Sequence, residues 1–225
     1  MNRFFKLIPI VMFLAACTPA VKPDPVDSVT QQSEIGYYPS STGLVWQYLL
    51  EGEVPGSVAP YELKIEGPQA IDSKVVTAFH FVGRGAERWY YRDFTKDGVF
   101  LVAEGTPNFY EVSYNPGVQE YPNQGRIIVG NTWSGVSRMK ISTPQVKNRE
   151  ATLTYQYRVL AQEKLVINKV AYDAFRISED KRIALGGDEK DLSESSLVWF
   201  VPKIGEIQRS NISDGKRILV ARNFK

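Results

Sequence analysis

The sequence predicts an all-β fold, mainly one strongly curved antiparallel meander sheet that forms a half-barrel or a barrel. Many segments alternate apolar and polar side chains with a period of two, and short turn sequences separate them. No segment of ten residues or more has the apolar spacing of an amphipathic helix. Strands that follow one another this closely pair with their neighbours in antiparallel fashion.

The clearest strand is expected over residues 151–160, where Leu153, Tyr155, Tyr157 and Val159 share one face and polar side chains share the other. Residues 75–82 carry apolar side chains on both faces, so we expect both faces to be partly buried. Turn pairs such as Asp-Gly and Gly-Gly separate the remaining candidates. These are 44–53, 60–66, 87–93, 97–103, 126–129, 135–142, 164–169, 172–183, 195–202, 205–211 and 216–223.

One segment, residues 103–125, lacks this pattern of short strands and turns. It contains three prolines and three glycines and predicts one long irregular loop.

The first sixteen residues have the layout of a cleaved secretory signal peptide: Arg3 and Lys6, an apolar run over 7–14, then small residues. The apolar run is shorter than the roughly 20 residues that a membrane-spanning helix needs. The junction Leu14-Ala15-Ala16-Cys17 resembles a bacterial lipoprotein signal. The alternative is an ordinary cleaved signal that happens to be followed by a cysteine.

The resemblance implies that Cys17 receives a diacylglycerol and a further acyl chain, which together make a firm membrane anchor. Thr18 follows the cysteine where an acidic residue would favour the inner membrane, so the resemblance implies the outer membrane or the cell surface. Residues 17–36 are expected to be the lipidated cysteine and a disordered tether, since they hold three prolines and no aromatic residue. Residues 37–225 are expected to form a single β-rich domain.

Cleavage before Cys17 would remove two cations and leave 25 basic against 25 acidic residues, so a nucleic-acid partner has no electrostatic support. Cys17 is also the only cysteine, and its lipidation would leave no thiol for a disulfide or for catalysis. His80 is the only histidine, and we interpret it as a half-buried side chain within a strand. The sequence therefore predicts no catalytic residue, no metal site and no cofactor.

A second resemblance rests on the opening of the domain, Tyr37-Tyr38-Pro39 followed by Gly43, Trp46 and Tyr48. It resembles the opening of uncharacterised bacterial envelope lipoproteins, and the stretches 166–177 and 199–209 fit the same group. The resemblance implies a curved antiparallel sheet, in some members similar to the half-barrel of lipoprotein carriers. It defines no catalytic residues.

A possible binding surface lies over residues 88–92. On a strand, Arg88, Tyr90 and Arg92 share one face, and Trp89 and Tyr91 share the other. Basic and aromatic groups together suit glycans or anionic headgroups. An ordinary outer sheet face is the preferred interpretation.

Two functions remain open. The first is a non-enzymatic binding module for a hydrophobic ligand or a partner protein, favoured by 11 Phe, 12 Tyr and 4 Trp and by the missing catalytic groups. The alternative is a carboxylate-dependent hydrolase of envelope polymers, for which Glu104 and Glu111 are the candidate pair. The sequence leaves the ligand and the oligomeric state open.

Overall fold

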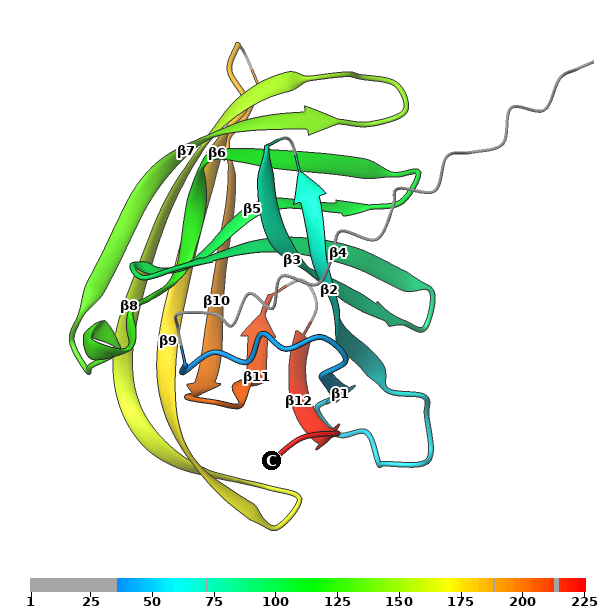
Figure 1. Cartoon of the computed structure of the whole chain (residues 1–225), viewed down its shortest axis with the longest axis vertical. Coiled ribbons are helices and arrows are strands. Elements are labelled where there is room, and N and C mark those ends of the chain that lie inside the picture. Colours follow the sequence, from blue (N-terminus) through cyan, green and yellow to red (C-terminus); the bar gives the residue numbers. More distant parts are fainter. Residues whose placement is uncertain (1–35, 72, 188, 213–214) are drawn as a thin grey trace, which may run out of the picture. The chain divides into compact units, whose positions relative to one another are not determined.

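The computed structural model describes residues 36–71, 73–187, 189–212 and 215–225. Within these ranges, twelve antiparallel strands form one closed barrel in which each strand pairs with its neighbour in the sequence (Figure 1). The first and last strands pair with each other and close the sheet. The strands are β1 (Val45–Leu50), β2 (Tyr61–Ile71), β3 (Lys74–Gly83), β4 (Ala86–Thr95), β5 (Gly98–Thr106), β6 (Tyr110–Pro122), β7 (Thr132–Ser142), β8 (Arg149–Ile167), β9 (Val170–Ala184), β10 (Leu192–Val201), β11 (Gly205–Asn211) and β12 (Gly215–Arg222).

The predicted all-β, antiparallel, barrel-like class is confirmed, and the sheet is closed where the carrier resemblance implied a half-barrel. In the described part of the chain, no helix has the length and apolar character needed to cross a membrane. The predicted signal peptide, Cys17 and the tether up to residue 35 lie outside the described residues.

Strand β8 shows how the sequence pattern builds the barrel. Leu153, Tyr155, Tyr157 and Val159 are buried, and the polar residues between them are exposed, as predicted. The strand is longer than expected: its pairing with β9 continues past a β-bulge between Val159 and Ala161 and joins the segments predicted as two strands.

The predicted irregular loop over 103–125 is wrong for most of its length. Most of that segment belongs to the paired strands β5 and β6. Its prolines are tolerated because they sit where a strand needs no backbone donor. Pro107 lies in the turn between the strands, Pro116 in a stretch where the β5–β6 register shifts, and Pro122 at the end of β6.

The strand predicted over 126–129 is also absent. A short 3-10 helix, η1 (Gln124–Arg126), and a turn connect β6 to β7 there. Ile127 is the only buried residue of that stretch, and Ile128 and Val129 are exposed. The three apolar side chains therefore do not form the inward face of a strand.

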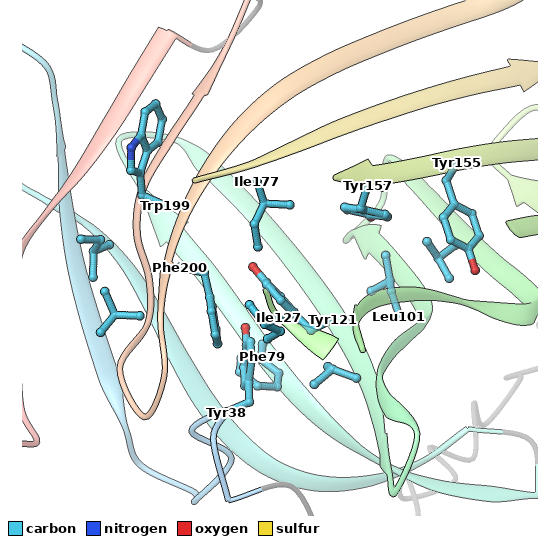
Figure 2. Close-up of a cluster of buried hydrophobic side chains, with 14 of the residues drawn as sticks. Tyr38, Phe79, Leu101, Tyr121, Ile127, Tyr155, Tyr157, Ile177, Trp199 and Phe200 are labelled. Carbon is cyan, nitrogen blue, oxygen red and sulfur yellow. The ribbon is translucent and has the colours of Figure 1, made fainter. Parts of the chain in front are cut away.

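The segment before β1 packs into the barrel interior. Tyr37 and Tyr38 are 2% and 5% exposed, and the ring of Tyr38 stacks on Phe200 of β10 at 5.9 Å. Phe200 also contacts Tyr121 of β6 at 4.6 Å between ring centroids. Figure 2 shows these rings gathered beside Phe79, whereas Trp199 lies on the other side of its strand. Of these rings, Tyr38 also lines the cavity described next.

A charged cavity inside the barrel

A cavity of about 140 Å³ lies between inward-facing side chains of most of the strands. Arg88 of β4 and Glu194 of β10 line it and are exposed, whereas Arg92 and Glu120 line it and are buried. The cavity therefore extends from the surface into the barrel, with Tyr38, from the segment before β1, among its lining residues.

The lining is charged, yet its charges balance. Its described residues contribute five cations and five carboxylates. The cations are Arg88, Arg92, Lys181, Arg209 and Arg217. The carboxylates are Glu104, Glu120, Glu179, Glu194 and Glu206.

Arg209 of β11 joins two of these carboxylates. Its Nη1 donates to Glu179 Oε2 at 2.6 Å, and its Nε and Nη2 donate to the two oxygens of Glu206 at 3.0 Å each. Tyr157 donates to Glu179 at 3.0 Å and Tyr121 donates to Glu206 at 2.8 Å. Such a network stabilises buried charges because each oxygen has a donor.

The network keeps both carboxylates ionised. Burial alone would raise the pKa of Glu206, but the charge and hydrogen bonds of Arg209 outweigh it and lower that pKa to about 2. Burial likewise opposes ionisation of Glu179, and Lys181 and Arg209 hold its pKa well below the ordinary value. Neither group is a protonated acid at neutral pH, which an acid catalyst of glycoside hydrolysis must be.

We expect the free energy of unfolding to fall as the pH drops from about 4.5 to about 2. A carboxylate whose pKa is lowered by folding stabilises the folded state above its unfolded pKa, and protonation removes that contribution. For Glu206 the loss should be on the order of 3 kcal/mol, since one pKa unit corresponds to about 1.4 kcal/mol. Urea unfolding at several pH values measures it. Glu206→Gln should show a shallower pH dependence, and equal slopes in the two proteins would contradict the assignment.

Arg92 and Glu120 form a second buried pair. Arg92 Nε donates to Glu120 Oε2 at 2.6 Å, and Nη2 donates to Oε1 at 3.2 Å. The guanidinium carbon lies 4.6 Å from the ring centre of Phe79 and 5.1 Å from that of Tyr90. The third nitrogen, Nη1, is buried and has no hydrogen-bond acceptor among the described residues.

The five residues of the predicted binding surface divide between two faces. Arg88, Tyr90 and Arg92 line the cavity, whereas the neighbouring positions Trp89 and Tyr91 face the other side of the sheet. The alternation was predicted, but the placement of one face inside the barrel was not.

On that other face, the Trp89 indole stacks on the His80 ring at 4.2 Å. His80 is 20% exposed at its side chain and its Nε2 lies 3.1 Å from Glu87 Oε1. This matches the half-buried strand histidine that the sequence predicted.

The structure does not bring Glu104 and Glu111 together. Glu111 pairs across the strands with Gly105, so it lies on the face opposite to that of Glu104. Glu104 lines the cavity and accepts a hydrogen bond from Tyr114 at 2.8 Å, and Glu111 is exposed. The residues described also contain no group of three or more His, Cys, Asp and Glu side chains arranged to hold a metal ion.

Four charged residues of the site were not predicted from the sequence: Glu120, Glu179, Glu206 and Arg209. A signal for Glu179 was present, because it lies two residues after Ile177 in β9 and therefore on the same face. Ile177 is 1% exposed, so a charged residue in that pattern points into the barrel. A charged residue at an apolar position of a strand pattern therefore predicts a buried, paired charge.

Fold and site together define a closed twelve-stranded antiparallel barrel with a charged interior cavity. No protein-family model matches the chain, and no curated protein matches it.

Solved structures of similar fold exist. A protein assigned as a lipoprotein from Parabacteroides distasonis is 10% identical, with a TM-score of 0.50 over 84% of this chain and 99% of that one. A protein assigned as exported, with a YmcC-like fold, from Bacteroides fragilis is 10% identical with a TM-score of 0.49, over 84% of this chain and 100% of that one. The hypothetical lipoprotein YmcC from Escherichia coli is 10% identical with a TM-score of 0.41, over 80% and 84%. At this identity, the likeness to the Parabacteroides protein shows a shared fold alone.

Proposed function

We propose that the protein is a bacterial envelope lipoprotein, anchored through Cys17, whose barrel is a non-enzymatic binding module. The signal sequence supports the anchor, and Thr18 favours the outer membrane or the cell surface. The Parabacteroides protein of similar fold is itself assigned as a lipoprotein. The observation that carries the binding role is the cavity that leads from exposed Arg88 and Glu194 to buried Arg92 and Glu120.

The lining of this cavity selects the kind of ligand. At about 140 Å³ it is smaller than the roughly 300–1,000 Å³ of pockets for drug-sized ligands, so it suits one small molecule or one group of a larger partner. An acyl chain placed there would desolvate charged side chains without offering hydrogen bonds, which is unfavourable. The sequence left a hydrophobic ligand and a partner protein open. The cavity argues against the hydrophobic ligand and favours a polar group, carried either by a small molecule or by a partner protein.

Native purification tests this role. The acylated protein, released from membranes in mild detergent, is expected to carry a small polar molecule or a partner chain that native mass spectrometry detects. The same protein after unfolding, washing and refolding is the control, and it should have lost the additional mass. A native mass equal to that of the acylated chain alone, with nothing released on unfolding, would argue against a binding module.

Cys17→Ser tests the anchor. We expect the variant to move from the membrane fraction to the released fraction, because removal of the thiol removes the site of acylation. Its urea-unfolding midpoint, measured on the purified protein, should equal that of the wild-type barrel. A variant that still sediments with membranes at wild-type levels would show that Cys17 is not the anchor.

A further inference from the structure

Four of the charged residues that line the cavity have no ion-pair partner among the described residues. The other six pair with one another: Arg92 with Glu120, Arg209 with Glu179 and Glu206, and Lys181 with Glu179. The four that remain are Arg88, Arg217, Glu104 and Glu194. They are two cations and two carboxylates, so a molecule that enters the cavity meets unpaired charges of both signs.

The two unpaired arginines lie beside the same aromatic ring. Phe81 of β3 is the cross-strand partner of Arg88 in β4, so their side chains are neighbours. The guanidinium carbon of Arg217 in β12 lies 4.8 Å from the centre of the Phe81 ring. Arg88 is exposed and Arg217 is half-buried, so both are accessible from the cavity that they line. Arg88 also interacts with the hydroxyl of Tyr90, which engages only part of its N–H donors.

The surroundings of Arg217 favour an added anion. Its cross-strand neighbour is Arg209, another cation, and like charges in directly opposite positions destabilise a sheet. The two carboxylates that Arg209 binds also accept hydrogen bonds from tyrosine hydroxyls, so they are already engaged. An anionic group of a ligand would supply the opposite charge that no described residue places in an ion pair with Arg217, and it would accept charge-assisted hydrogen bonds.

Glu194 supplies an unpaired negative charge on the β9–β10 side of the cavity. Its cross-strand neighbour is Lys181, but the ammonium group of Lys181 is bound to Glu179. Among the described residues, the carboxylate of Glu194 therefore has no ion pair. Glu194 is exposed and lines the cavity, so a cationic group of a ligand can reach it.

Glu104, the other carboxylate without an ion pair, is less available. It accepts a hydrogen bond from Tyr114 at 2.8 Å. It also interacts electrostatically with both Arg88 and Lys181, which compensate its charge at longer range. Glu194 is therefore the better site for a cationic group.

We propose that the cavity binds a small zwitterion, with its carboxylate or phosphate held by Arg88 and Arg217 and its ammonium group held by Glu194. An anion alone would leave Glu194 unpaired, and a cation alone would leave both arginines unpaired. A zwitterion also preserves the balance of five cations and five carboxylates in the lining. This inference rests on the proposed binding role of the barrel and names the class of ligand that its cavity selects.

Zwitterions and their singly charged analogues test the inference. Each probe is titrated into the purified acylated protein, in non-ionic detergent and freed of bound molecules, and NMR measures its dissociation constant. Glycine is compared with acetate and methylamine, 4-aminobutanoate with butanoate and butylamine, and glycerophosphoethanolamine with dimethyl phosphate and ethanolamine. At least one zwitterion is expected to bind saturably and about tenfold or more tightly than either of its analogues.

The same titrations distinguish two sources of a zwitterion. Binding of glycerophosphoethanolamine in preference to both amino acids would indicate the headgroup of a phospholipid. Binding of an amino acid in preference to glycerophosphoethanolamine would indicate a free small molecule. Either preference supports the zwitterion and identifies its anionic group as a phosphate or a carboxylate.

Variants assign the two ends of the ligand. Glu194→Gln should weaken binding of the zwitterion by roughly tenfold or more and leave binding of its anionic analogue unchanged, because only the zwitterion has an ammonium group. Arg88→Gln and Arg217→Gln should weaken binding of both. Circular dichroism of each variant checks that the barrel is folded. The matched control is Arg182→Gln, which replaces a 70% exposed arginine outside the cavity lining and should leave all affinities unchanged.

Three results would overturn the proposal: no saturable binding of any zwitterion, a singly charged analogue that binds as tightly as its parent zwitterion, or equal effects of Glu194→Gln on the zwitterion and on its anionic analogue. The native mass measurement judges the binding role separately. A barrel that is purified with a bound molecule of another class would keep its binding role and refute the zwitterion.

Discussion

Replacement of Arg209 by methionine is expected to lower the free energy of unfolding by about 3–5 kcal/mol. Arg209 makes three hydrogen bonds to Glu179 and Glu206, and the low pKa of both carboxylates depends on it. Without the guanidinium, Glu206 loses the ion pair with Arg209, and Glu179 retains only its ion pair with Lys181. Urea unfolding followed by circular dichroism measures the loss.

Two controls separate this effect from the general consequences of losing an arginine. Arg182→Met breaks an ion pair whose arginine side chain is 70% exposed, and it should change stability by less than about 1 kcal/mol. Arg209→Met combined with Glu206→Leu removes one of the carboxylates that would be left uncompensated, and it should recover part of the loss. A loss below about 1 kcal/mol in Arg209→Met alone would mean that the carboxylates find other partners.

The buried charges explain which parts of the fold the sequence predicts and which it does not. The period-two pattern of β8 identifies its inward side chains because apolar and polar residues alternate without exception between Leu153 and Val159. The same alternation assigns Arg88, Tyr90 and Arg92 to one face of β4. Which face lies inside depends on the closure of the sheet, and this closure comes from pairing between β1 and β12, far apart in the chain.

The network around Arg209 is hard to predict for the same reason. Glu179 lies thirty residues before it in the sequence, and Tyr121 still further away. Register across β10 brings Glu179 to Arg209, and closure of the barrel brings Tyr121 to them across the interior. Short sequence patterns contain no information about either. The misassigned segment 103–125 has a different cause, since its prolines occupy a turn, a register shift and a strand end that composition alone cannot distinguish from a loop.

Phe200→Ala is expected to lower the free energy of unfolding by about 3–5 kcal/mol. Phe200 is fully buried, and its ring contacts Tyr37, Tyr38 and Tyr121 at centroid distances of 6.0, 5.9 and 4.6 Å. The alanine would leave a cavity bounded by three rings. Two of those rings hold the segment before β1 inside the barrel, so the expected loss combines the missing contacts with weaker attachment of that segment.

A matched control for Phe200→Ala is Phe109→Ala in the turn between β5 and β6, where the side chain is 74% exposed and the expected change is below about 0.5 kcal/mol. Hydrogen exchange adds a local measurement. Because the backbone N–H of Lys203 donates to the carbonyl of Tyr37, its protection reports how firmly the segment before β1 is held. In Phe200→Ala, the lower global stability alone predicts a certain increase in the exchange rate of Lys203. An increase larger than this would show that Phe200 attaches the segment before β1 to the barrel. Loss of stability with unchanged local protection would assign Phe200 to the core alone.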